Sequence, residues 1–433
     1  MKSARGKASP RLRRHAFVLC AAIGISTSGI AACAGLVGVE EVRLRRDSGF
    51  EDVTDDFEDP EETGGRDTGP KPLENILEVA PGDQHTCARK PDGTVKCWGS
   101  DAFNQLGIGG DAGVYPTPVA LAITDAVRIS SGKNHSCIVH KGGTVSCWGD
   151  NQDGQLGNGQ KNTRSPLPVD VLNVSGAIGI ACGASFSCAL LGSGGVSCWG
   201  NGLGGQLGNG GTQIQPTAQA VSMLSDAVGI AAGESHACAV KAGGTLVCWG
   251  DGINGQLGNG DQLPRTTPAG VNLKNVAVVS AAQRSTCALL NDGAVHCWGA
   301  NELGQVGSGA ASQSPNPSPI VVSNLDKGIA VSAGAIHACA VKQGGLIVCW
   351  GNGYQGQLGD GTTRLDASTP QPSPVAVVQG TSRAIGVGTG GNHSCAPTTD
   401  GNILCWGENV HGELGTGVVG GQLQSPETVK TYP

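Results

Sequence analysis

The sequence predicts an all-β chain whose body, residues 73–433, folds as a seven-bladed β-propeller. Gly occurs 72 times and charged residues make up only 15% of the chain, which indicates many short strands joined by tight turns. Short runs of Val, Ile, Ala and Leu are bounded by Gly, Asn, Asp and Pro. All seven Trp residues recur in one tripeptide, and a Gly-rich repeat of about 50 residues is typical of propeller blades rather than helical solenoids.

The first 33 residues have the layout of an export signal. Six Lys and Arg and no acidic residue accompany the apolar stretch 16–32. That stretch ends in Ile30-Ala31-Ala32-Cys33, which resembles the bacterial lipobox, where a lipidated Cys becomes the mature N-terminus. We therefore predict lipidation at Cys33. An ordinary signal peptide or an uncleaved anchor also fits, because about 17 apolar residues just cross a bilayer, and each alternative exports the body.

Residues 34–72 predict a disordered acidic tether. They contain five Lys and Arg against twelve Asp and Glu, and such a segment repels itself and stays extended. Ala34 and Gly35 follow Cys33 in place of the Asp that often marks inner-membrane retention, which favours the outer membrane. The body carries seventeen basic residues against twenty-three acidic ones. Since neither segment offers a basic footprint for phosphates, we expect no nucleic-acid partner.

The repeat unit is the same in all seven copies. A short apolar strand leads to a Gly, a second strand with a Cys, a turn, Cys-Trp-Gly, a tetrad such as Gly255–Gly258, and a loop containing Pro. We expect the Trp and the tetrad Leu to fill the space between blades, as structural framework rather than ligand platforms. The seven Trp are Trp98, Trp148, Trp199, Trp249, Trp298, Trp350 and Trp406.

This repeat resembles that of the regulator of chromosome condensation family, whose members fold as seven-bladed propellers. The tetrads that carry the resemblance are Asn104–Gly107, Gly154–Gly157, Gly205–Gly208, Gly255–Gly258, Gly304–Gly307, Gly356–Gly359 and Gly412–Gly415. The resemblance covers residues 73–433 and implies the fold. It implies little about function, because one fold hosts many functions.

Fourteen of the seventeen Cys form pairs ten residues apart. Between the first pair, Pro91-Asp92-Gly93 predicts a three-residue hairpin turn with a left-handed Gly, which places the two Cys opposite each other. Opposed residues are about 4.5–5.5 Å apart at Cα, within disulfide range, and disulfides require an oxidising compartment. The predicted disulfides are Cys87–Cys97, Cys137–Cys147, Cys188–Cys198, Cys238–Cys248, Cys287–Cys297, Cys339–Cys349 and Cys395–Cys405.

Reduced buried thiols and a metal site are the alternatives for these Cys. A His stands two residues before the Cys in five repeats, at His85, His135, His236, His337 and His393. Zinc sites favour Cys pairs separated by two to four residues, and two repeats carry Phe186 and Ser285 in place of the His. We therefore expect hydrogen-bonded framework His residues, no metal and no cofactor. Cys182 replaces a small residue of the other repeats, which predicts a buried free thiol.

No catalytic constellation departs from the repeat background, so we expect no catalytic residues and no enzyme activity. The stretch after the tetrad varies most between units, and the longest is 360–377. Variable loops on a rigid scaffold form a natural recognition surface. We expect a monomeric, lipid-anchored cell-envelope binding or scaffold protein that recognises a protein or a surface polymer through these loops and touches the membrane only through its lipid.

Three alternatives remain open. The resemblance implies a nucleotide-exchange factor, the role of the founding family member, or a secreted enzyme inhibitor of the kind found among bacterial propellers of this repeat type. A hydrolase or lyase that uses propeller-face carboxylates is the third. Apolar residues near 76–79 and 427–429 predict an opening and a closing strand, and leave open whether the two chain ends share a blade.

Overall fold

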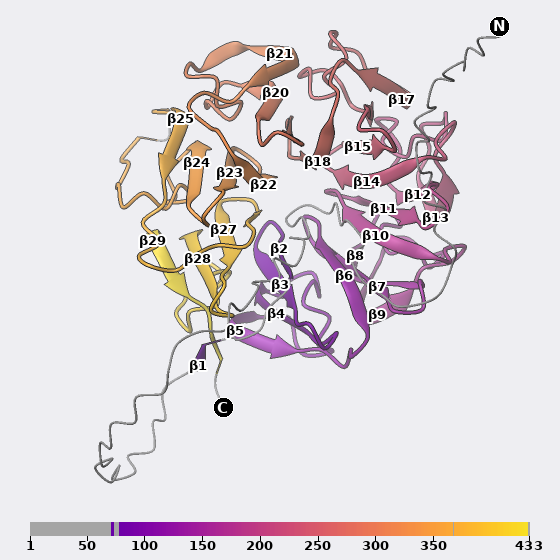
Figure 1. Cartoon of the computed structure of the whole chain (residues 1–433). Helices are drawn as coiled ribbons and strands as arrows, with labels where there is room; N and C mark the ends of the chain where they lie inside the picture. Colours follow the sequence, from indigo (N-terminus) through magenta and orange to yellow (C-terminus); the bar gives the residue numbers. More distant parts are fainter. Residues whose placement is uncertain (1–70, 73–77, 367, 432–433) are drawn as a thin grey trace, which may run out of the picture.

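The computed structural model describes residues 71–72, 78–366 and 368–431. Seven four-stranded antiparallel sheets are arranged around a central axis, as Figure 1 shows, and no described residue belongs to a helix. The prediction of an all-β, seven-bladed propeller is confirmed. No helix among the described residues has the length and apolarity needed to cross a membrane. Cys33 and most of the predicted tether lie outside the described residues.

Each blade uses four consecutive strands, ordered from the axis outwards. Blade 1 contains β2 (Glu78–Pro81), β3 (His85–Arg89), β4 (Val95–Ser100) and β5 (Val114–Ala120). Blade 2 contains β6 (Ala126–Ser131), β7 (His135–His140), β8 (Val145–Asn151) and β9 (Thr163–Asp170). Blade 3 contains β10 (Ala177–Cys182), β11 (Phe186–Leu191), β12 (Val196–Gly200) and β13 (Gln215–Ala220). Blade 4 contains β14 (Ala227–Ala232), β15 (His236–Lys241), β16 (Leu246–Gly250) and β17 (Arg265–Val271).

The remaining three blades follow the same order. Blade 5 contains β18 (Val276–Ala281), β19 (Ser285–Leu290), β20 (Val295–Asn301) and β21 (Ser312–Val321). Blade 6 contains β22 (Gly328–Ala333), β23 (His337–Lys342), β24 (Ile347–Gly351) and β25 (Gln371–Ala376). Blade 7 contains β26 (Gly388–Thr389), β27 (His393–Pro397), β28 (Ile403–Glu408) and β29 (Gln422–Thr428).

The two chain ends do not share a blade. Blades 1 and 7 each have four strands of their own, so the ring closes by packing β2 against β26 and β27. A separate two-stranded pair, β1 (Lys71–Pro72) with β30 (Lys430–Thr431), joins the ends and lies against β5. Lys71 and Pro72 belong to the segment that we assigned to the tether. The ring is therefore held at its seam by side-chain packing, by hydrogen bonds between blades 1 and 7 and by this short ladder.

A Trp joins each blade to the blade before it. All seven Trp are fully buried. Each indole Nε1 donates a hydrogen bond of 2.9–3.0 Å to the carbonyl of the second tetrad residue of the preceding blade. At the seam, Trp98 of blade 1 donates to the Glu413 carbonyl of blade 7. Burying so much aromatic surface with the indole N–H satisfied makes this contact a strong joint between blades.

The last Gly of the tetrad is required by the same joint. Gly258 has a φ of +70°, and a Cβ there would lie 2.5 Å from Trp298 Nε1. Gly107 shows the same arrangement, with a φ of +70° and a Cβ position 2.6 Å from the Trp148 ring. Only Gly combines the left-handed conformation with so close an approach. The tetrad thus recurs because it both turns the chain and leaves room for the next indole.

The fourteen paired Cys form seven disulfides, each within one hairpin. Their S–S distances run from 2.03 to 2.14 Å, and every pair is directly opposed in the ladder. The Cα atoms are 4.0–4.1 Å apart, closer than we expected, as suits a non-hydrogen-bonded pair, where strands approach most closely. The predicted turn is present, since Gly93 has a φ of +88° and donates to the Lys90 carbonyl.

Candidate functional site

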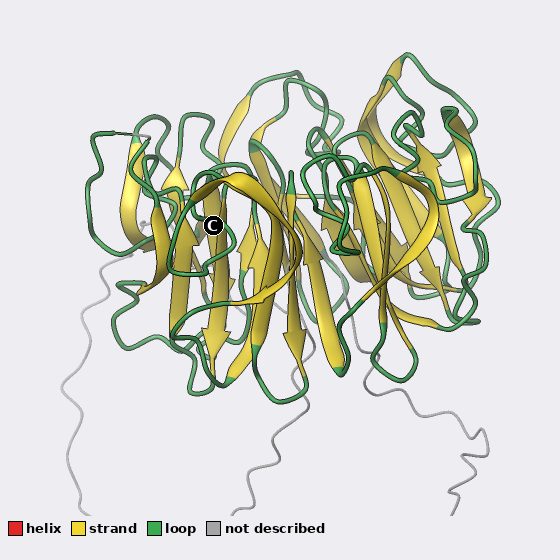
Figure 2. Ribbon diagram, turned by 90° about the horizontal axis from the view of Figure 1, so that it is seen from above, coloured by secondary structure: helices red, strands yellow, loops and turns green. Residues whose placement is uncertain are grey.

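The strand order gives the propeller two different faces, which Figure 2 shows with the ring seen edge-on. On one face lie the turns between the first and second strands and the loops between the third and fourth strands, such as 82–84 and 101–113 in blade 1. We call this the loop face. On the other lie the disulfide-bonded hairpin turns and the links between blades, such as 90–94 and 121–125. We call this the hairpin face.

The loop face is acidic, whereas the hairpin face is balanced. The acidic residues in the turns and loops of the loop face are Asp83, Asp101, Asp111, Asp153, Glu234, Asp251, Asp261, Glu302, Asp360, Asp366 and Glu413. The basic residues there are Lys133, Lys161, Arg284 and Arg364. On the hairpin face, the corresponding acidic residues are Asp92, Asp125, Asp226, Asp292, Asp326 and Asp400. The basic ones are Lys90, Lys141, Lys274, Lys327 and Arg383. Only the loop face therefore attracts cations.

The roots of the loops are rigid while their tips are exposed. In blade 2, Asn151 Oδ1 accepts from the Leu156 N–H at 3.0 Å, and Gln155 Nε2 donates to Asp150 at 3.1 Å. Equivalent Gln side chains bond in the same way in blades 3 and 4. The tips carry exposed apolar side chains: Leu203, Ile253, Leu263, Tyr354, Leu365, Val410, Val418 and Val419. Such an arrangement presents variable contact groups on a fixed base.

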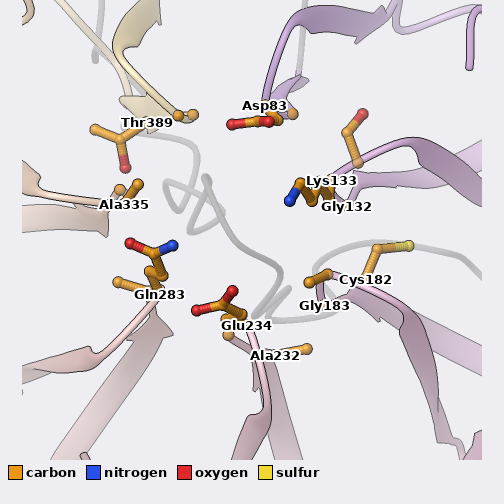
Figure 3. Close-up of a pocket in the computed structure, with 18 of the residues that line it drawn as sticks. Asp83, Gly132, Lys133, Cys182, Gly183, Ala232, Glu234, Gln283, Ala335 and Thr389 are labelled. Atoms are coloured by element: carbon orange, nitrogen blue, oxygen red, sulfur yellow. The ribbon is translucent and has the colours of Figure 1, made fainter. Parts of the chain in front are cut away.

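A funnel opens on the axis of the loop face. Its wall contains the residues that end the innermost strands, which are Pro81, Ser131, Cys182, Ala232, Ala281, Ala333 and Thr389. Because these side chains are small, they leave a cavity of about 270 Å³ on the axis. Four polar side chains stand around the opening, as Figure 3 shows: Asp83, Lys133, Glu234 and Gln283. The sequence did not lead us to predict these four residues, although they occupy one variable position of the repeat, which follows a Gly in six blades and Ala282 in blade 5.

The five His residues lie between blades beneath this face. Each His Nε2 is 2.8 Å from a Ser or Thr hydroxyl of the next blade, and the pairs are His85–Ser136, His135–Ser187, His236–Thr286, His337–Ser394 and His393–Thr86. Each hydroxyl donates to the backbone carbonyl of a tetrad, so it accepts from the imidazole N–H. Burial lowers the pKa of each of these His to about 3, which keeps the rings neutral.

The two repeats without this His also lack the hydroxyl that would face it in the next blade. Phe186 and Ser285 stand in place of the His, and the facing positions in the next blades are Ala237 and Ala338, which carry no hydroxyl. The His and its hydroxyl therefore occur together or not at all. A comparison of neighbouring repeats in the sequence would have revealed this pairing before the structure did.

Cys182 is a buried free thiol. Its Sγ lies 3.4 Å from the Ser130 carbonyl, and burial raises the pKa of the thiol to about 12. Among the described residues, one group of possible metal ligands has its atoms within 4.8 Å of one another, formed by His135, Cys137 and Cys182. Cys137 is bonded to Cys147, so it offers no thiolate while the disulfide is intact. The structure thus gives this group no complete set of metal ligands.

Blade 7 departs from the other blades at the seam with blade 1. Glu413 occupies the tetrad position at which the six other blades carry Gln. Its side chain is fully buried, Oε2 accepts from the His411 N–H at 2.7 Å, and Oε1 has no hydrogen-bond partner in the part of the chain that the structure describes. Burial, aided by the nearby charges of Glu408 and Asp83, raises the pKa of Glu413 to about 7. A carboxyl group therefore titrates near neutral pH where the other blades have an amide.

Comparison with known proteins identifies the repeat. The regulator of chromosome condensation (RCC1) repeat matches residues 92–139, 142–190, 193–240, 243–289, 292–341 and 345–396. A second description of this repeat matches all seven blades, at residues 76–105, 126–155, 177–206, 227–256, 276–305, 329–357 and 384–413. The chain belongs to the RCC1 repeat family. Its resemblance to that family, expected from the tetrads, is confirmed.

Curated relatives share only part of their length with this RCC1-repeat chain. The human protein described as probable E3 ubiquitin-protein ligase HERC6 is 33% identical over 105 residues, which are 23% of this chain and 10% of that protein. The ultraviolet-B receptor UVR8 of Arabidopsis thaliana is 36% identical over 104 residues, 23% of each protein. The chain thus spans no more than about a quarter of the length of these relatives. The similarity lies within the repeats.

Solved structures of RCC1-type propellers share the fold. Prp20p of Saccharomyces cerevisiae, studied together with its binding to Gsp1p and histones, superposes with a TM-score of 0.69 at 20% identity, over 83% of this chain and 88% of that chain. Human WBSCR16 superposes with a TM-score of 0.69 at 21% identity, over 78% and 95% of the two chains. At such identities the likeness shows the fold alone.

Proposed function

We propose that this RCC1-repeat propeller is an exported, lipid-anchored protein of the cell envelope that binds a protein partner through its loop face. The observation that carries the proposal is the contrast between the two ends of each blade. The hairpins repeat with one spacing and one disulfide, whereas the loops differ in length and sequence and present exposed apolar tips. Loops that vary on a rigid scaffold provide what recognition requires.

The disulfides support export. Disulfides such as the seven within these hairpins persist in an oxidising compartment and are rare in the cytosol. The same compartment follows from the basic and apolar segments that precede Cys33. The strand pair β1–β30 contacts the outer strand β5 through β30, so the proposed tether reaches the ring at its rim.

Binding accounts for the loop face better than catalysis does. Solved RCC1-type propellers include one studied for its binding to other proteins, which supports a protein partner here. An exported chain does not meet a cytosolic GTPase, which disfavours nucleotide exchange. The acidic loop face disfavours nucleic acid, because phosphates require basic side chains.

Capture experiments with matched variants test the proposal. We expect the purified chain to retain one or more proteins from envelope extracts, and a variant with residues 360–370 replaced by a short Gly-Ser linker to lose them. Lys141→Ala, an exposed change on the hairpin face, is the control and should retain them. Equal capture by the loop variant and the wild type would contradict the role of the loop face.

The anchor is tested separately. Cys33→Ser should move the protein from the membrane fraction to the soluble fraction of the envelope, since lipid-linked Cys33 is the proposed membrane contact. Wild-type protein that stays soluble after export, or a Cys33→Ser variant that stays in the membrane, would contradict lipid anchoring at this residue.

A further inference from the structure

The funnel on the loop face contains charged side chains that the fold does not use. Asp83, Lys133, Glu234 and Gln283 come from the same position in four different blades, and Figure 3 shows all four around one opening. Among the described residues, no ion pair or side-chain hydrogen bond includes any of them. Their hydrogen-bonding capacity is therefore free for a ligand.

Several charged residues elsewhere on the loop face are paired with one another. Arg364 bonds Asp360 at 2.7 Å, and Arg284 bonds Glu302 at 2.7 Å. Asp83, Lys133 and Glu234, which have no such partner among the described residues, converge on the axis, where the small side chains at the ends of the inner strands leave open space.

The sign of the charge favours a cation. Two carboxylates, Asp83 and Glu234, face a single ammonium group at Lys133. Glu408 and Glu413 lie near Asp83 on the blade 7 side, and His411 is the remaining titratable group close to it. Burial, together with the charge of Glu408, raises the pKa of Asp83, while Lys133 and His411 oppose that change. A cation that enters the funnel would relieve the repulsion among these carboxylates.

The size of the funnel suits a small ligand group such as one side chain. Its volume of about 270 Å³ falls below the roughly 300–1,000 Å³ typical of pockets for small organic molecules. The acceptors stand on blades 1, 4 and 5, around the axis rather than on one side of it. A guanidinium group suits acceptors that are spread around an opening, because its five N–H donors fan out in a plane.

We propose that the funnel binds an arginine side chain presented by the protein partner, with Asp83 and Glu234 as the charged acceptors. This inference rests on the proposed function, since it names the chemical group by which the partner is recognised at the centre of the loop face. The surrounding apolar loop tips then contact the residues that flank the arginine.

Titration with a blocked arginine tests the funnel without the partner. The probe is Nα-acetyl-arginine amide, the neutral comparison is Nα-acetyl-citrulline amide, and the protein is the full disulfide-bonded chain observed by calorimetry or NMR. We expect the arginine compound to bind and the citrulline compound to bind at least tenfold more weakly, the loss expected for one charge-assisted hydrogen bond. Equal binding of the two compounds, or no binding of the arginine compound, would overturn the proposal.

Three variants locate the binding within the funnel. Glu234→Gln should weaken arginine binding about tenfold, and Lys133→Gln should strengthen it because it removes the one opposing charge. Asp111→Asn, which changes an exposed carboxylate on the same face but away from the funnel, should have no effect. A weaker affinity for Lys133→Gln would overturn the assignment. The substituted funnel side chains have no hydrogen-bond or ion-pair partner among the described residues, so unchanged melting temperatures serve as the folding check.

Capture of the partner then separates this inference from the proposed function. If Glu234→Gln loses both the arginine compound and the captured protein, the inference is supported. If Glu234→Gln loses the arginine compound but captures the protein as well as wild type does, the loop face remains the interface and the arginine assignment fails. If wild type binds the arginine compound but captures no protein, the proposed function fails although the funnel binds a guanidinium group.

Discussion

The two faces of the propeller are made by the same seven repeats, yet they differ in what they can tolerate. On the hairpin face, each turn must bring two Cys into register, so its length is constant. On the loop face, the chain is fixed at the tetrad by the next Trp, and whatever follows is free to vary. The comparison teaches that the sequence repeats where disulfides and Trp packing constrain the chain. The segments beyond these constraints are the ones available for recognition.

Acidification should produce the largest effect, and it acts beneath the loop face. The folded pKa of the five inter-blade His is about 3, below the usual 6.5, so the unfolded chain takes up protons that the folded chain refuses. The free energy of unfolding should therefore fall as the pH drops from 6.5 towards 3. Its slope against pH is at most about 7 kcal/mol per pH unit for five His. Urea unfolding at a series of pH values measures the slope.

A variant identifies the source of this acid sensitivity. His236→Phe copies Phe186 of blade 3, and with Thr286→Ala it copies the apolar pair of that joint. The double variant should show a smaller slope than wild type between pH 6.5 and 3. His140→Ala, which removes a half-buried His near the hairpin face paired with Asp125, should not reduce the slope. An identical slope for the double variant would exclude the buried His as the cause.

A pair of glycines gives the sharpest contrast between the faces. Gly258→Ala should destabilise the protein by roughly 3 kcal/mol or more, because the added Cβ would be 2.5 Å from Trp298 and φ is +70°. Gly142→Ala, in a hairpin turn with nothing within 4 Å of the added Cβ, should change stability by less than about 1 kcal/mol. Thermal and urea unfolding compare them, and equal effects would contradict the Trp–tetrad joint.

Removal of one disulfide should have a smaller effect. The double variant Cys238→Ala with Cys248→Ala opens a short loop. Chain entropy predicts that the free energy of unfolding falls by about 3 kcal/mol. This is an upper value, because packing against the neighbouring strands keeps the hairpin folded. The seven-bladed fold should persist because six bridges remain, and circular dichroism, which reports the strands, checks this. Unchanged stability in urea would show that the hairpin turns alone hold the register.

The seam gives a pH dependence of the opposite sign. Burial raises the pKa of Glu413 from 4.5 to about 7 in the folded protein. The contribution of its neutral carboxyl group to the free energy of unfolding is therefore present below pH 4.5 and is lost as the pH rises through 7. Glu413→Gln restores the residue of the other six blades and should stabilise the protein by about 2 kcal/mol at pH 8, with little change at pH 5. Melting temperatures measured at pH 8 and pH 5 test this expectation. Gln357→Glu makes the reverse exchange in blade 6 and should destabilise the protein at pH 8.

The smallest effect concerns reactivity at Cys182. Since burial raises the pKa of its thiol to about 12, little thiolate exists at pH 8, and a thiol reagent should label the native protein slowly and the unfolded protein fast. Mass spectrometry of the labelled peptide measures both rates. Rapid native labelling would show that the funnel wall opens, which would weaken the interpretation of the loop face as a rigid base.

Much of the fold could be predicted because the constraints are local and repeated. Cys pairs ten residues apart, with a Gly such as Gly93 between them, determine a hairpin by themselves. The funnel could not be predicted in this way. Asp83, Lys133 and Glu234 are about 50 residues or more apart in sequence, and each is an ordinary polar residue in its own repeat.

The sequence by itself determined the number of blades, the pairing of the Cys within each hairpin and the position of the variable loops, because each follows from short-range spacing that recurs seven times. Only the tertiary structure decided how the ring closes, which hydroxyl each His meets and which side chains share the axis. Those contacts join residues of different blades, such as Thr86 with His393. The curvature of the whole ring, rather than any one repeat, brings them together.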